Sequence, residues 1–172
     1  MLRDLGSHLL DLTFWLLGFP KVEQVLSANF SLFVPALAAA AGKSADAEDF
    51  ASGLLRLEGG TAVQLEINFG SHIEKEEVYL DIYGTTGGAT TRGAAGLALF
   101  AADRSAITKT TPMRLTIASE STQAHFVHCL QSGREPLVTP EQGIAVIRVL
   151  DALYAGGIRA ALGATERPAA IG

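Results

Sequence analysis

The sequence has little of several features that mark particular classes of protein. Its one cysteine, Cys129, excludes a disulfide within the chain and is typical of a reducing compartment. It has no run of basic residues, and its net charge of -5 makes nucleic acids and anionic membranes poor partners. No apolar run is long enough to cross a bilayer, and the start lacks the features of a signal peptide. These absences predict a cytoplasmic protein.

The composition supplies enough apolar material for one well-packed domain. Of the 172 residues, 48% are hydrophobic, and a chain of this length buries roughly 70% of its unfolded surface. We predict a single domain over residues 1–163. The Ala-rich segment 35–49 is long for a loop and is expected to be mobile. Residues 164–172 are expected to form a frayed tail.

Alternating apolar and polar residues predict a largely antiparallel sheet, because the strands follow one another without helices between them. Strands are expected over residues 22–33, 50–57, 62–69, 77–83, 88–91, 96–101 and 113–118. Two helices are expected near the end of the chain. One spans residues 121–131, and the other begins at Thr139 as N-cap, with Pro140 and Gln142 forming the first turn, and ends at Gly163.

Together these elements predict an α+β fold. Its open sheet would carry helices on one face, and the other face would be exposed or used for oligomerisation. We hypothesise a homo-oligomer with sheets face to face, through a mixed polar and aromatic surface formed by Gln64, Glu66, Asn68, Tyr79, Asp81 and Tyr83.

Chemistry is suggested at one place, the first eighteen residues. Their apolar residues are mostly at helical spacing, and Gly18 and Pro20 signal the end of a helix. Asp4, His8 and Asp11 would share one face of that helix. A carboxylate one turn before an imidazole can fix its tautomer and orientation, as a general acid or base requires.

Simpler interpretations of the same residues stay open. Asp4 could be an N-cap that accepts from backbone N–H groups of Gly6 or Ser7. His8 could be a half-buried helix residue, and Asp11 a solvated charge. Gly6 favours a functional reading, because a glycine within a helix costs about 1 kcal/mol relative to alanine and indicates a close approach.

Other patterns are weaker. His125, His128 and Cys129 are metal-ligand types on one helix, but no nearby carboxylate or second cysteine completes a tetrahedral set, so no metal is predicted. The segment Gly84–Gly88 lacks the Lys-Ser/Thr of a phosphate loop. His72 follows a strand and precedes a charged run, as in a solvated turn.

Three stretches in order resemble one family. They are the D-x-G-x-H-x-x-D-x-x-x-W-x-x-G string that starts at Asp4, the strand and turn from Val78 to Gly88, and the segment from Phe126 to Tyr154. This pattern is similar to the C-terminal domain of the Gfo/Idh/MocA oxidoreductases, which include glucose-fructose oxidoreductase and inositol dehydrogenase. The resemblance spans essentially the whole chain.

The resemblance implies an NAD(P)-dependent oxidoreductase acting on CH–OH groups of a sugar, polyol or related compound. Members pair an N-terminal Rossmann domain with this C-terminal domain and use a lysine from an E-K-P motif. Asp4 and His8 match the family's catalytic Asp and His, and Asp11 matches its later acidic position. The loop at His72 could reach the substrate.

The chain departs from the family in lacking E-K-P and G-x-G-x-x-G. NAD or NADP would therefore be bound by the absent N-terminal domain, with no cofactor on this chain, which is predicted to be inactive alone. The alternative is a non-catalytic assembly or ligand-binding module that keeps the fold without the reaction. A third possibility is a substrate-binding partner that uses a cofactor domain from another chain.

Overall fold

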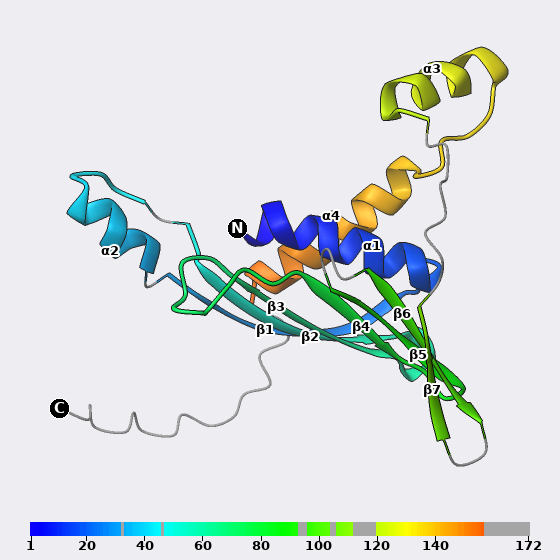
Figure 1. The fold of residues 1–172 in the computed structure, drawn as a ribbon. Helices are drawn as coiled ribbons and strands as arrows, with labels where there is room; N and C mark the ends of the chain where they lie inside the picture. The colour runs from blue at the N-terminus through cyan, green and yellow to red at the C-terminus, as the bar shows by residue number, and fades with distance from the viewer. Residues whose placement is uncertain (32, 46, 93–95, 104–105, 112–119, 157–172) are drawn as a thin grey trace. The chain divides into compact units, whose positions relative to one another are not determined.

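The computed structural model describes residues 1–31, 33–45, 47–92, 96–103, 106–111 and 120–156. The chain divides into two compact units (Figure 1). Unit 1 comprises Met1–Ser71 and Leu137–Gly172, and unit 2 comprises His72–Pro136.

Unit 1 is a three-stranded antiparallel sheet with helices packed on one face (Figure 1). The sheet order is β1-β2-β3, and each strand pairs antiparallel with the next. The elements in chain order are η1 (Leu2–Gly6), α1 (Ser7–Leu17), β1 (Val22–Phe30), α2 (Phe33–Ala40), β2 (Phe50–Leu57), η2 (Glu58–Gly60), β3 (Ala62–Asn68) and α4 (Pro140–Tyr154).

The core of unit 1 lies between this sheet and the helices α1 and α4. Alternate residues of β3 point into it, so that Leu65 and Ile67 are buried while Gln64 and Glu66 are exposed, as the alternation predicts. The buried apolar residues of this core are Leu2, Leu10, Phe14, Val25, Ala51, Leu55, Leu57, Leu65, Ile67, Val146, Val149, Leu150 and Leu153. Removing this much apolar surface from water is the main favourable term in folding.

Unit 2 contains a four-stranded antiparallel sheet and one helix. The strands are β4 (Tyr79–Tyr83), β5 (Gly87–Arg92), β6 (Leu97–Asp103) and β7 (Ala106–Thr110), in the order β4-β5-β6-β7, and the helix is α3 (Thr122–Ser132). The strand β7 was not predicted, because all five of its residues are exposed and its side chains show no apolar face.

The α+β class and the antiparallel pairing are confirmed, but the chain forms two sheets where the sequence predicts one. The predicted six-residue face is therefore divided: Gln64, Glu66 and Asn68 lie on β3, and Tyr79, Asp81 and Tyr83 lie on β4. The segment between β3 and β4 has a positive φ at Gly70 and four charged residues from Glu74 to Glu77. It forms no strand, and β4 pairs with β5 instead.

A helix occupies the end of the segment 22–33, predicted as a strand, and the start of the segment 35–49, predicted as a loop. The segment 33–40 forms α2, and the Asp49 carboxylate accepts hydrogen bonds from the N–H groups of Phe33 at 2.5 Å and Val34 at 2.8 Å. Alanine is the best helix former, and a carboxylate at the first turn caps the free N–H groups. The expected mobility of 35–49 and the single-domain boundaries 1–163 stay predictions.

The ends of the helices follow their capping residues. Thr139 and Gln142 form the predicted capping box, with Gln142 N–H donating to Thr139 Oγ1 and Thr139 N–H donating to Gln142 Oε1. The helix α4 ends at Tyr154, well before the predicted Gly163, because the chain turns at Gly156 with a φ of 80°.

The predicted strand 113–118 and tail 164–172 lie outside the described residues. No helix in the described ranges is long and apolar enough to span a membrane.

Candidate functional site

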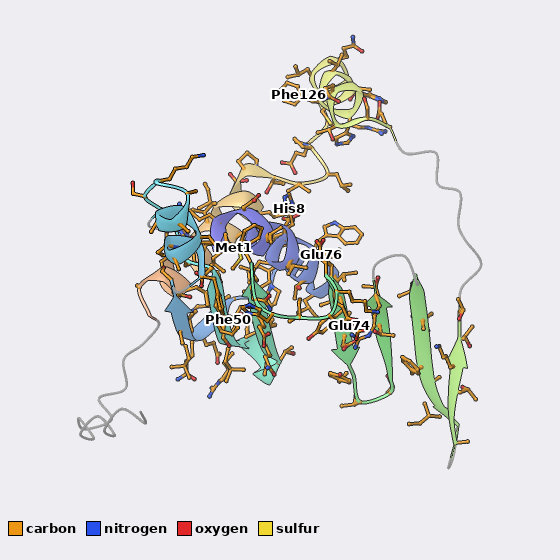
Figure 2. All side chains as sticks on the ribbon, turned by 60° about the vertical axis from the view of Figure 1, so that its left-hand side comes forward. Met1, His8, Phe50, Glu74, Glu76 and Phe126 are labelled. Carbon is orange, nitrogen blue, oxygen red and sulfur yellow. The ribbon has the colours of Figure 1, made fainter. Side chains whose placement is uncertain are left out.

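The candidate catalytic residues lie on the outer face of the first helical segment. This segment begins with the wide π-helical turn η1 and continues as α1. Its buried residues recur every four positions, at Leu2, Gly6, Leu10 and Phe14. Asp4 and His8 are each two positions away from these, and both are exposed. Figure 2 labels His8 on this helix. Single π-turns within helices occur frequently at functional sites.

Gly6 lets this segment lie close to the sheet. A Cβ atom added at Gly6 would lie 2.8 Å from Cδ1 of Ile67 and 2.9 Å from Cδ1 of Leu2, which is closer than packed atoms approach. The close approach inferred from a glycine in a helix is therefore confirmed. It fixes the depth, against the core of unit 1, of η1, which carries Asp4, and of the start of α1, which carries His8.

The structure excludes the capping interpretation of Asp4. Neither η1 nor α1 has a side-chain cap, and Asp4 lies inside η1, where its backbone oxygen accepts a hydrogen bond from Ser7 Oγ at 2.7 Å. Among the described residues, no hydrogen bond or ion pair involves the Asp4 carboxylate or the His8 imidazole. Asp11 is partly buried. Catalytic hydrogen bonds often form only once substrate is bound, so the two exposed groups fit an acid–base pair without ligand.

Sequence reasoning missed the contacts that hold this turn in place. Glu48 Oε1 accepts hydrogen bonds from Leu2 N–H at 2.6 Å, Tyr154 Oη at 2.7 Å and the Met1 ammonium at 2.8 Å. Arg3 pairs with Asp151 on α4 at 2.7 Å. Glu48 is separated from these partners by 46 to 106 residues, so no local pattern could have indicated it.

These contacts perturb two ionisable groups. Burial by itself raises the pKa of the Glu48 carboxyl group, but the hydrogen bonds from Met1, Tyr154 and Leu2 outweigh burial and lower this pKa from 4.5 to about 2. Burial, together with the neighbouring Glu48 carboxylate, raises the pKa of the Tyr154 hydroxyl group. At neutral pH Glu48 is therefore ionised and Tyr154 keeps its proton.

The fourth residue singled out, His72, belongs to unit 2, whereas Asp4, His8 and Asp11 belong to unit 1. His72 is exposed and lies just after β3, at the first position of its unit. The structure therefore brings Asp4 and His8 to one helix face and leaves His72 a separate hypothesis.

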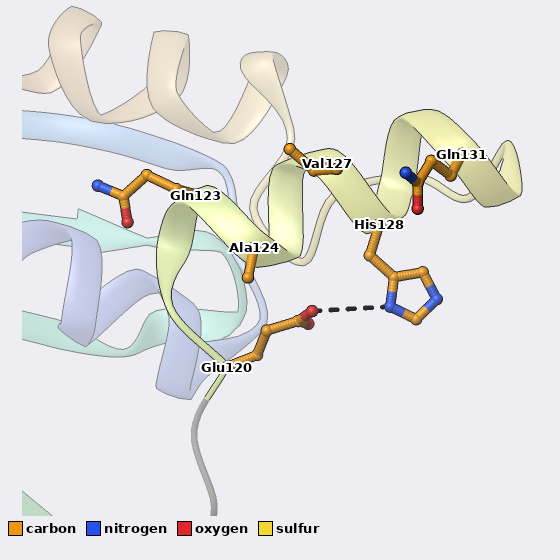
Figure 3. Close-up of a pocket in the computed structure, with 6 residues that line it drawn as sticks. All are labelled: Glu120, Gln123, Ala124, Val127, His128 and Gln131. Carbon is orange, nitrogen blue, oxygen red and sulfur yellow. Dashed lines mark ion pairs between the residues drawn. The ribbon is translucent and has the colours of Figure 1, made fainter.

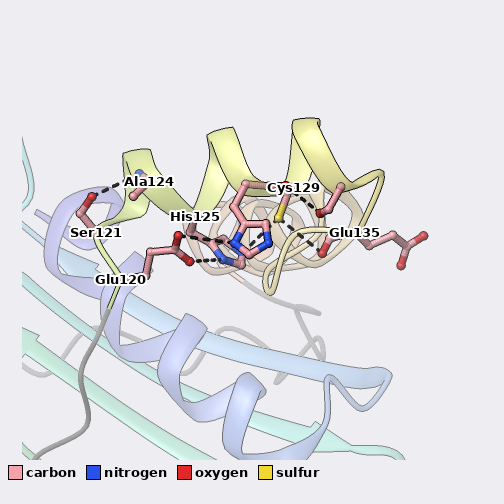
Figure 4. A network of polar contacts seen from close by, with 8 residues as sticks. Glu120, Ser121, Ala124, His125, Cys129 and Glu135 are labelled. Carbon is pink, nitrogen blue, oxygen red and sulfur yellow. Dashed lines mark hydrogen bonds and ion pairs between the residues drawn. The ribbon is translucent and has the colours of Figure 1, made fainter.

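A second polar cluster lies on α3. Glu120 Oε2 and Oε1 lie 3.6 Å from His125 Nδ1 and 3.7 Å from His128 Nδ1, and His125 Nε2 is 3.5 Å from Cys129 Sγ (Figure 4). The side chains of Glu120 and His128 border a shallow pocket of about 500 Å³ (Figure 3). The nearby carboxylate, which the sequence analysis did not find, is thus Glu120. In the part of the chain that the structure describes, no three His, Cys, Asp or Glu residues are placed to hold a metal ion.

The described residues do not form a nucleotide-binding cradle. Every pairing between described strands is antiparallel. A dinucleotide site of the Rossmann type needs parallel strands joined by a helix, with a glycine-rich turn at the helix start. The residues that the structure describes therefore form no cofactor site of the Rossmann type.

Comparison with known proteins gives one match to a family over most of the chain. The family model described as "Oxidoreductase family, C-terminal alpha/beta domain" matches residues 1–156. A search of curated proteins finds no significant match.

Solved structures share the fold at low sequence identity. An aldose-aldose oxidoreductase from Caulobacter crescentus, complexed with glycerol, is 20% identical with a TM-score of 0.66, and the match covers 90% of this chain and 44% of that one. An oxidoreductase domain protein from Kribbella flavida is 19% identical with a TM-score of 0.73, and the match covers 90% of this chain and 48% of that one. The WlbA dehydrogenase from Bordetella pertussis, in complex with NADH and UDP-GlcNAcA, is 22% identical with a TM-score of 0.61. That match covers 90% of this chain and 41% of the dehydrogenase. This chain thus spans less than half the length of these proteins.

Proposed function

Since the chain belongs to the Gfo/Idh/MocA oxidoreductase family through its C-terminal α/β domain, we propose that it is the substrate-binding half of an NAD(P)-dependent oxidoreductase. The full-length enzyme would act on CH–OH groups of a sugar, polyol or related compound, and this chain alone would be inactive. The observation that carries the proposal is the placement of Asp4 and His8. Both are exposed on one face of a helix whose other face is fixed in the core of unit 1.

The neighbours support the proposed reaction class. Two of the structures that share this fold contain a nicotinamide cofactor, as NAD+ or NADH, and one contains the polyol glycerol. The matched region is less than half of each of those chains. A separate nucleotide-binding half, holding NAD or NADP, would therefore supply the hydride acceptor.

The contribution of this chain concerns the proton and the substrate. His8 would accept the proton of the substrate hydroxyl group, and Asp4, one turn earlier, would orient the imidazole and stabilise its cationic form. Asp11 and His72 would support or bind the substrate. A positioned acid–base group of this kind contributes about 10²–10⁴-fold to the rate.

An assay of the full-length protein tests this proposal. Sugars and polyols are offered with NAD+ or NADP+, and formation of the reduced nicotinamide is followed by its absorbance. We expect at least one substrate to be oxidised, and Asp4→Asn to lower kcat at least about tenfold with the KM for the cofactor unchanged. Absence of any turnover, with substrates bound but unchanged, would instead support a non-catalytic ligand-binding module.

We also propose that the protein is cytoplasmic and that it forms a homo-oligomer through its open sheet faces. The single free cysteine supports a reducing compartment. On β3, Gln64 and Glu66 are exposed, and on β4 the exposed fractions of Tyr79 and Tyr83 are 50% and 90%. Tyrosine is enriched at protein interfaces. Analytical ultracentrifugation that finds only monomer at micromolar concentration would contradict this assembly.

A further inference from the structure

A small contact network holds the helical turn that carries the candidate pair. The Glu48 carboxylate accepts hydrogen bonds from Leu2 N–H at 2.6 Å and from the Tyr154 hydroxyl at 2.7 Å. Its side chain is only 13% exposed, and Leu2 is 1% exposed. Short hydrogen bonds to a carboxylate in so buried a position are stronger than those between neutral groups.

The backbone of this turn needs such a partner. The first N–H groups of a helix have no acceptor within the helix, and they are usually satisfied by a capping side chain. The residue that precedes η1, Met1, provides no side-chain cap, and Glu48 supplies the acceptor from a distant part of the chain.

Tyr154 orients the Glu48 carboxylate and links the turn to α4. The Arg3 guanidinium lies 5.3 Å from the centroid of the Tyr154 ring and pairs with Asp151, one turn earlier on the same helix. Arg3 and Asp151 are both more than half exposed, so their ion pair contributes little. The partly buried link from Leu2 through Glu48 to Tyr154 is the one that fixes the turn.

We propose that Glu48, held by Tyr154, is a positioning residue for the Asp4–His8 pair. This inference rests on the proposed function. Asp4 follows Leu2 by two residues, and no hydrogen bond or ion pair with the described residues fixes the direction of the Asp4 or His8 side chain. The backbone of η1 and of α1, which continues from it, must therefore set where Asp4 and His8 point. A displacement of about 1 Å at a reacting group can lower a rate about 10²-fold.

Kinetics of the full-length protein test the proposal. We expect Glu48→Ala to lower kcat, expressed per active site, about tenfold. Tyr154→Phe should lower it about threefold. The KM for the nicotinamide cofactor should stay unchanged, because this turn does not bind the cofactor. Glu48→Gln keeps an acceptor for Leu2 N–H and should recover most of the rate. Glu58→Ala, which removes an exposed carboxylate of η2, is the matched control for Glu48→Ala and should behave as wild type.

Hydrogen exchange of the full-length protein gives a second readout that does not depend on catalysis. Glu48→Ala should speed exchange of the amides of residues 2–6 about tenfold and leave the amides of β2 unchanged. If His8→Ala abolishes turnover while Glu48→Ala and Tyr154→Phe keep the wild-type kcat, the positioning role is wrong and the proposed function stands. If no variant at Asp4 or His8 affects turnover, the proposed function itself fails, whatever the exchange rates show.

Discussion

The two units of the chain are built in different ways. The core cluster of unit 1 joins helices and sheet and contains completely buried side chains such as Leu55 and Leu150. Among the described residues of unit 2, only Ala98 and Cys129 are both apolar and buried. The described strands of unit 2 pair antiparallel, and a Cβ added at Gly87 or Gly88 would lie 2.6 or 2.8 Å from a backbone oxygen of a neighbouring strand. The candidate catalytic residues lie on the unit with the well-packed core, which is where a site that needs fixed geometry belongs.

Truncation of one leucine in each unit tests this difference most strongly. Leu150 is 0% exposed and Leu99 is 42% exposed. Leu150→Ala should reduce the free energy of unfolding by about 2–5 kcal/mol, because it leaves a cavity in the core, and Leu99→Ala by less than about 1 kcal/mol. Denaturant unfolding measures both values. Equal losses in the free energy of unfolding for the two variants would show that unit 2 has a core that stabilises it as much as the core of unit 1 does.

Alanine in place of glycine separates side-chain packing from backbone packing. A Cβ at Gly88 would lie 2.8 Å from the Ile82 backbone oxygen, which cannot move without disturbing the β4–β5 pairing. We expect Gly88→Ala to cost about 2–3 kcal/mol. Gly6→Ala, which meets only side-chain ends, should cost about 1 kcal/mol. Gly143→Ala, with open space around it, should stabilise α4 by up to about 1 kcal/mol. A smaller loss for Gly88→Ala than for Gly6→Ala would contradict this distinction.

Acid unfolding should report on the Glu48 network. In this chain by itself, where the Met1 ammonium makes the contact that lowers it most, the pKa of Glu48 falls from 4.5 to about 2 in the folded state. The stability that Glu48 contributes is therefore present above about pH 4.5 and is lost as the pH falls toward 2. Glu48→Gln should flatten the decline of stability in this range. Glu77→Gln, which removes a half-exposed carboxylate paired with Lys75 in unit 2, should leave the decline as it is.

The helix caps should give the smallest effects. The cap of α4 is a reciprocal box of two hydrogen bonds, whereas Ser121 caps α3 with one bond to Ala124 N–H at 3.2 Å. Thr139→Ala should cost about 1–2 kcal/mol and Ser121→Ala about 0.5 kcal/mol. Thermal unfolding followed by circular dichroism measures the difference. A larger loss of stability for Ser121→Ala than for Thr139→Ala would contradict the expected order of the two caps.

The sequence correctly predicted those elements whose formation depends on residues close together in the chain. The hairpin of β2 and β3, the glycine stop after α1 and the capping box at Thr139 depend on residues within a few positions of one another. The helix α2 was missed because its cap, Asp49, lies at least 15 residues away. Division into two sheets was missed because the alternation of Tyr79 to Tyr83 shows that a strand forms but does not specify its partner.

The candidate site was predictable only in part: its two candidate catalytic residues were identified, but the residues that hold them in place were not. The spacing of Asp4 and His8 indicated one helix face, and the structure places both on it. The residues that fix that face could not be found, because Glu48 and Tyr154 meet it only through the tertiary fold. A pattern within one helix shows which groups could act together, while long-range contacts decide how firmly they are held.

The most direct test of the central claim, that Asp4 and His8 are an acid–base pair, compares two histidines in the full-length protein. His8→Ala should lower kcat by about 10²–10⁴-fold, because it removes the group proposed to accept the substrate proton. His128→Ala removes an exposed imidazole on α3 that has no place in the proposed reaction, and it should keep the wild-type kcat. Wild-type turnover in the His8→Ala enzyme would contradict the account.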